Sequence, residues 1–105
     1  SGTMKVRFYK VTVILNGIET VLYIPASGKN NLTRILKAFE LSTVKIEFLG
    51  WHIVNIFCSP KDGVYFSANI DEKPIFYQKN QLGFEYLFNC LDSHKYKKVS
   101  YNSTV

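Results

Sequence analysis

The stretch IPASGKNNLTRILKAF, residues 24–39, sets a Ser-Gly-Lys loop in front of a helical pattern, an arrangement that can hold phosphate. A nucleotide-binding P-loop needs a glycine, four further residues and then Gly-Lys-Ser/Thr, because backbone amides surround the phosphate and the hydroxyl binds magnesium. Tyr23 stands where the first glycine is required, and Asn30 stands where the hydroxyl is required. This excludes an NTPase loop. What remains is Gly28, Lys29 and the amides of a helix start, which attract anions.

The two histidines, His52 and His94, are candidates for a general base or a metal ligand. Neither has a partner at the spacing that metal sites use, so no metal or cofactor is expected. On one strand His52 and Cys58 would lie about 20 Å apart, too far for a base to activate a nucleophile. The remaining enzyme hypothesis is a small nuclease or phosphodiesterase built on His52 with Tyr65 or Glu47. The sequence favours a protein without catalytic residues.

The elements that position these residues follow from the spacing of apolar side chains. Strands are predicted at 5–15 and 18–24, on either side of Asn16-Gly17, because both central residues of a type I′ hairpin turn need positive φ. The next segment has apolar residues at the i, i+3, i+4, i+7 spacing of an amphipathic helix, which predicts a helix from residue 32 to about residue 41. These residues are Leu32, Ile35, Leu36 and Phe39.

The second half of the chain is predicted to consist mostly of strands. Alternating residues predict a strand at 44–50 and a more apolar strand at 51–58, meeting near Gly50, followed by a strand at 64–70. A second helical stripe predicts a helix at about 80–94. The order β-β-α-β-β-β-α predicts an α+β fold, with an antiparallel sheet of about five strands and two helices packed on one face.

A chain of 105 residues with 47% hydrophobic residues is expected to fold as one domain. Residues 1–3 precede Met4 and are interpreted as a cloning remnant, residues 4–98 as a single α+β domain and residues 99–105 as a frayed tail. No segment has the apolar length of a signal peptide or membrane span, so a cytoplasmic protein without a membrane partner is expected. Abundant Lys, Asn and Ile suggest an AT-rich gene from a phage or mobile element.

The formal net charge of +5 is concentrated at the two ends of the chain. Residues 1–37 carry a net charge of +5, residues 38–92 carry −3 and residues 93–105 carry +3. Phosphate contacts need basic groups and base stacking needs aromatic groups, so the leading hypothesis is a small, non-catalytic, nucleic-acid-associated binding protein, for DNA or RNA. The residues expected to form this surface are Lys5, Arg7, Lys10, Lys29, Arg34 and Lys37 for phosphate, and Tyr9 and Tyr23 for stacking.

The chain holds eight Phe, seven Tyr and one Trp, more aromatic side chains than two thin layers readily bury. The alternative hypothesis is therefore a regulator or inhibitor that binds one protein, for example a nucleic-acid enzyme, through Trp51 and Tyr65. An exposed strand edge also allows a homodimer to form by strand pairing.

Overall fold

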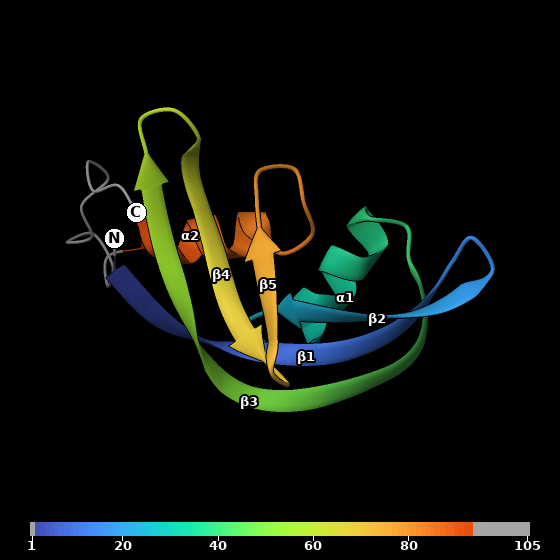
Figure 1. Ribbon diagram of the computed structural model, residues 1–105. Coiled ribbons are helices and arrows are strands. Elements are labelled where there is room, and N and C mark those ends of the chain that lie inside the picture. Colours follow the sequence, from blue (N-terminus) through green and yellow to red (C-terminus); the bar gives the residue numbers. More distant parts are fainter. Residues whose placement is uncertain (1, 94–105) are drawn as a thin grey trace. The chain divides into compact units, whose positions relative to one another are not determined.

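The computed structural model describes residues 2–93 of the chain (Figure 1). Within these residues it contains five strands and two helices, so the expected α+β class is confirmed. In chain order the elements are β1 (Gly2–Leu15), β2 (Ile18–Pro25), α1 (Lys29–Ala38), β3 (Ser42–Ser59), β4 (Gly63–Ile70), β5 (Lys73–Tyr77) and α2 (Phe84–Asp92). The strands form a sheet in the order β2-β1-β3-β4-β5, in which β1–β2, β3–β4 and β4–β5 pair antiparallel.

The described residues divide into two compact units. Residues 6–51 form the hairpin unit, with most of β1, all of β2 and α1, and the first part of β3. Residues 2–5 and 52–93 form the three-strand unit, with the remainder of β3, β4, β5 and α2. The single domain expected over residues 4–98 and the packing of both helices on one face of the sheet stay predictions. The tail expected at 99–105 lies outside the described residues.

The β1–β2 hairpin of the hairpin unit forms as its turn residues predict. Leu15 pairs with Ile18 across Asn16 and Gly17, whose φ angles are 51° and 79°, as a type I′ turn requires. The apolar side chains of the hairpin and of α1 make the core of this unit. Among its buried members are Val11, Val13, Ile24, Leu32 and Leu36.

Helix α1 begins and ends earlier than its apolar stripe predicts. The backbone N–H of Leu32 already donates to the carbonyl of Gly28 at 2.9 Å, so the first turn precedes the stripe. At the other end the N–H groups of Glu40 and Leu41 donate to the carbonyls of Lys37 and Leu36, which is a Schellman arrangement. The residue that usually makes this stop recognisable in a sequence is glycine, whereas here Glu40 takes the positive φ of 54°.

The predicted break between strands at 44–50 and 51–58 is wrong, because β3 is one strand of 18 residues. Gly50 lies inside β3 with a φ of 82°, a conformation that other side chains rarely adopt. A glycine within a strand pattern indicates either a turn between two strands or a local irregularity inside one strand, and the local sequence does not distinguish the two.

The segment at 73–77, for which the sequence predicts no definite state, is strand β5. Asp71 and Glu72 connect it to β4 as a two-residue turn, with φ angles of 53° and 62°. This is type I′ geometry without the glycine that normally signals it. Pro74 is tolerated because β5 lies at the edge of the sheet, where one side of the strand needs no backbone donors.

The core of the three-strand unit lies between one side of β3–β4–β5 and helix α2, which lies behind these strands in Figure 1. Strand pairing places Val54 opposite Ala68 and Ile56 opposite Phe66, and all four are buried. The Phe66 ring contacts the ring of Phe84 on α2, with 5.6 Å between centroids. Further buried members of this core are Cys58, Ile70, Tyr77, Leu87 and Leu91.

The core of the three-strand unit contains one phenol, and the helix that covers it differs from its predicted bounds. Tyr77 brings a phenol into it, and desolvation by burial raises the pKa of that phenol well above its ordinary value. Helix α2 runs from Phe84 to Asp92 and begins later than the predicted residue 80, because Gly83 precedes it in the left-handed conformation with a φ of 92°.

Candidate nucleic-acid interface

The side of β3–β4–β5 that faces away from α2 carries aromatic side chains. Phe57 pairs with Tyr65, and Phe76 pairs with Ser67, so alternation places all three rings on the side opposite Ile56 and Phe66. The rings of Phe57 and Tyr65 stack, with 5.0 Å between centroids and 26° between planes. Phe76 is 56% exposed. We call Phe57, Tyr65 and Phe76 the aromatic face.

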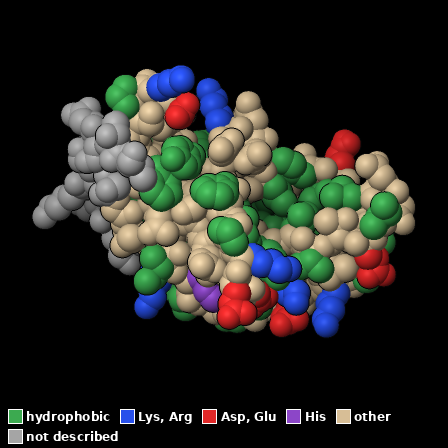
Figure 2. All heavy atoms as spheres, viewed as in Figure 1, with side chains coloured by type: hydrophobic (Ala, Val, Ile, Leu, Met, Phe, Trp, Pro, Cys, Tyr) green, Lys and Arg blue, Asp and Glu red, His purple; other side chains and the backbone are tan. Residues whose placement is uncertain are grey.

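The neighbours of the aromatic face on the same side of the sheet are polar or exposed. Asn55 pairs with Ser67 and Asn69 pairs with Pro74, and Ile53 is 57% exposed. Figure 2 shows hydrophobic side chains at the surface over these strands. In the three-strand unit α2 covers the opposite side of the strands, so the aromatic face is not part of the core between the strands and α2.

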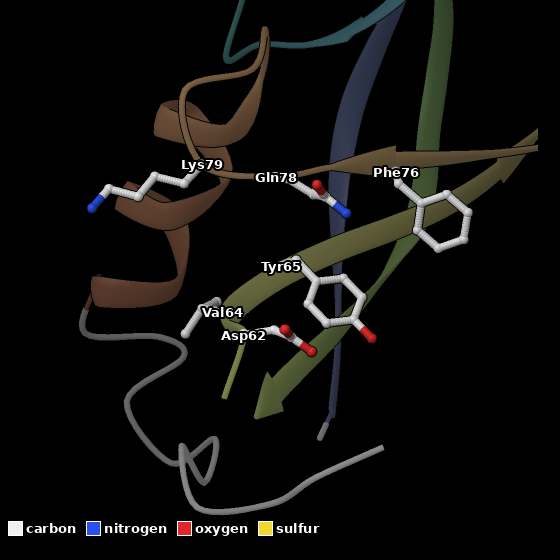
Figure 3. Close-up of a pocket in the computed structure, with 6 residues that line it drawn as sticks. All are labelled: Asp62, Val64, Tyr65, Phe76, Gln78 and Lys79. Atoms are coloured by element: carbon white, nitrogen blue, oxygen red, sulfur yellow. The ribbon is translucent and has the colours of Figure 1, made fainter. Parts of the chain in front are cut away.

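A hollow of about 580 Å³ adjoins the aromatic face. Its lining combines the two rings of Tyr65 and Phe76 with the polar side chains of Asp62, Gln78 and Lys79 (Figure 3). In Figure 3 the Gln78 amide lies beside both Tyr65 and Phe76, Asp62 lies on the other side of Tyr65, and the Lys79 ammonium points away from the rings. The hollow therefore offers stacking surfaces with a carboxylate, an amide and a cation around them.

The backbone of both loops at the hollow is held by side chains. Ser59 Oγ accepts hydrogen bonds from the N–H groups of Lys61 and Asp62, each at 3.2 Å. Gln81 Oε1 accepts from the N–H of Gln78 at 2.9 Å. The turn before β4 and the turn after β5 are thus fixed without using the Asp62 carboxylate or the Gln78 side-chain amide.

The residues predicted to contact phosphate do not all lie on one surface. On β1, Arg7 and Lys10 point to opposite sides of the strand, because the β1–β2 register runs without interruption from Phe8 to Leu15 and side chains alternate. Lys10 instead pairs with Tyr23, which brings two members of the predicted set together. Lys5 belongs to the three-strand unit, whereas the other five basic residues belong to the hairpin unit.

On α1 the predicted phosphate contacts are exposed. Arg34 and Lys37 are three residues apart, so they lie on the same stripe of the helix surface, away from buried Leu32 and Leu36. Lys29 is exposed in the first turn, and Gly28 caps the helix without a side-chain hydrogen bond.

Arg7 and Trp51, which the sequence assigns to different surfaces, are in contact. The Arg7 guanidinium lies over the Trp51 ring, 4.7 Å from its centroid, and also donates to the backbone carbonyl of Ser27. Trp51 is 54% exposed. Tyr9, predicted to stack on bases, is buried against Phe48 with 5.3 Å between ring centroids, so it offers no open ring face.

Two residues of the enzyme hypothesis, His52 and Tyr65, lie on opposite sides of the strands. His52 shares its side of β3 with buried Val54, whereas Tyr65 pairs with Phe57 on the opposite side. Residues 2–93 contain no group of three or more His, Cys, Asp and Glu side chains that could hold a metal ion. Over the same residues, neither helix has the length and apolar character needed to cross a membrane.

Two members of the aromatic face were missed by sequence reasoning. Phe57 lies in the run WHIVNIFC, whose nearly continuous apolar character predicts burial on both sides. Phe76 lies in the short segment without a predicted state. The useful signal in the sequence is the strand GVYFSANI, in which alternation puts the adjacent Tyr65 and Phe66 on opposite sides.

The chain matches no known protein family, no curated protein and no solved structure, so the arrangement of side chains alone supports a functional conclusion.

Proposed function

We propose that the protein binds single-stranded nucleic acid without catalysing a reaction. The observation that supports this proposal is the aromatic face, in which stacked Phe57 and Tyr65 and exposed Phe76 lie on the side of the strands that α2 leaves uncovered. Nucleic-acid bases stack on such rings, and each stacked base contributes about 1–3 kcal/mol. In a duplex the faces of the bases are already stacked, so single strands are the preferred ligand.

Polar groups around the aromatic face complete the proposed site. Asn55, Ser67 and Asn69 supply donors and acceptors for base edges on the same side of the sheet. Lys61 and Lys79 are exposed in the flanking turns, where they contact phosphate. Stacking rather than charge therefore provides most of the proposed affinity.

A salt titration tests this division between stacking and charge. Two phosphate contacts, from Lys61 and Lys79, predict a slope of log K against log salt of about −1 to −2 for single strands. We expect fluorescence anisotropy to give such a slope with single-stranded oligonucleotides and much weaker binding with the matching duplex. A slope near −4 would instead indicate that the six predicted basic residues of β1 and α1 make the main contact. Equal affinity for strand and duplex would contradict the proposal.

A protein partner is the second candidate, and it rests on Arg7 and Trp51. Tryptophan and arginine dominate the energetics of many protein interfaces, and here the two side chains are in contact while Trp51 remains more than half exposed. The site belongs to the hairpin unit and the aromatic face to the three-strand unit, so substitutions separate the two functions.

We expect Trp51→Ala to weaken a specific protein complex by about 2 kcal/mol or more, whereas Tyr65→Ala leaves it unchanged. The measurement is retention of a single stoichiometric protein from a nuclease-treated lysate by immobilised wild type and by each variant. If Trp51→Ala retains the same protein in the same amount, Trp51 is not the anchor.

A further inference from the structure

We infer that the hollow beside the aromatic face is a binding site for guanine, and this inference rests on the proposed binding of single-stranded nucleic acid. The hollow measures about 580 Å³, which is within the range of pockets that bind small organic groups. Tyr65 and Phe76 line it from neighbouring strands and supply the surfaces on which a base stacks.

The carboxylate of Asp62 selects among bases because it only accepts hydrogen bonds. Guanine is the base whose pairing edge places two donors side by side, the ring N1–H and the exocyclic amine. In adenine and cytosine a ring nitrogen that accepts hydrogen bonds stands beside the amine, so one carboxylate oxygen would face a lone pair. In uracil the single ring N–H lies between two carbonyl oxygens. A carboxylate at the edge of the stacked base therefore favours guanine.

Gln78 supplies the donor that the remaining guanine acceptor needs. Its side-chain amide lies beside Tyr65 and Phe76 in Figure 3, on the other side of Tyr65 from Asp62. The amide nitrogen donates to guanine O6 or N7, which are the acceptors that proteins commonly read on this base. The Lys79 ammonium points away from the rings and is placed for a phosphate of the same strand.

The loops that carry these groups are arranged independently of a ligand. The N–H of Asp62 donates to Ser59 Oγ, and the N–H of Gln78 donates to Gln81 Oε1. Both bonds use the backbone N–H of the residue concerned, so the carboxylate and the amide are presented on fixed turns. Replacement of the Asp62 carboxylate by an amide of the same shape keeps the turn and changes only the chemistry of the edge.

The test compares uridine oligonucleotides that carry one central guanine, adenine, cytosine or uracil, by fluorescence anisotropy with wild type and Asp62→Asn. We expect wild type to bind the guanine strand about 5- to 150-fold more tightly than the other three, the range given by one good bidentate base contact. In Asp62→Asn the preference should fall below about 3-fold, while affinity for the uracil strand stays unchanged. The matched control is Glu85→Gln, which removes one negative charge on α2 and should keep the full preference.

The outcomes separate this inference from the proposed function. Equal binding of all four strands by wild type, or an unchanged guanine preference in Asp62→Asn, overturns the guanine site while leaving strand binding intact. Absence of binding to any strand overturns the proposed function and the inference with it. Competition by guanosine monophosphate, with uridine monophosphate as control, identifies the source of the base. Displacement of the guanine strand supports a site for the free nucleotide, and guanine preference without displacement supports a site for the base within a strand.

Discussion

Alanine at Tyr65 is expected to weaken the binding of single-stranded oligonucleotides by about 5- to 150-fold, which corresponds to about 1–3 kcal/mol for one lost stacking surface. Tyr65 stacks on Phe57 and also lines the hollow, so its ring contributes to both parts of the proposed site. Phe57→Ala should also weaken the binding of single-stranded oligonucleotides, because it removes the ring on the neighbouring strand that stacks on Tyr65.

Two control variants test whether the loss of affinity comes from the aromatic ring at this position. Tyr65→Phe keeps the ring and should bind nearly as well as wild type. Phe39→Ala removes an aromatic side chain that is 45% exposed at the end of α1, outside the aromatic face, and should leave the affinity unchanged. Circular dichroism spectra and melting curves of the variants show whether they remain folded. Wild-type affinity in both folded variants, Tyr65→Ala and Phe57→Ala, would exclude the aromatic face as the binding surface.

The Phe66→Ala substitution is expected to lower the free energy of unfolding by about 3–5 kcal/mol. The Phe66 side chain is fully buried, and Phe66 pairs with Ile56 and Tyr77 on the two neighbouring strands. Its ring contacts the Phe84 ring, with 5.6 Å between the ring centroids. Its removal leaves a cavity between the strands and α2. Since small proteins are stable by only about 5–15 kcal/mol, this single change removes a large share of the total. Urea unfolding followed by circular dichroism measures the loss.

Phe76→Ala is the matched control for stability, because Phe76 lies on the adjacent strand but on the exposed side. We expect it to change the free energy of unfolding by less than about 1 kcal/mol. If Phe66→Ala is too unstable to give a folded baseline, Phe66→Leu fills most of the space and should lose about 1–2 kcal/mol. Equal losses for the alanine variants at Phe66 and Phe76 would mean that the two sides of the strands are not distinguished as core and surface.

Local sequence patterns predicted a strand, turn or helix correctly where the residues that determine it lie within one short segment. Asn16-Gly17 predicted the first hairpin because the turn itself needs residues that accept positive φ. The apolar stripe of α2 predicted its buried side through Phe84, Leu87 and Leu91. The prediction failed where an uncommon residue took a position that glycine usually holds, as Glu40 does after α1 and Asp71-Glu72 do before β5.

The candidate site was harder to predict because its residues come from separate segments. Phe57, Tyr65 and Phe76 come from three successive strands and meet only through the β3–β4 and β4–β5 registers. The prediction that grouped Arg7 with Lys10 assumed one exterior surface, whereas alternation along β1 puts them on opposite sides. Residues of the predicted set that share an element, such as Arg34 and Lys37, remain neighbours.

The sequence by itself determined the α+β class, the first hairpin and the amphipathic character of both helices, because turn geometry and apolar periodicity are properties of short segments. Only the tertiary structure decided which aromatic side chains become core and which become surface. Phe66 and Tyr65 are adjacent residues of the same chemical kind, and strand alternation alone says only that they point in opposite directions. Their burial differs because α2 packs against one side of the strands and buries Phe66, whereas Tyr65 lies on the other side.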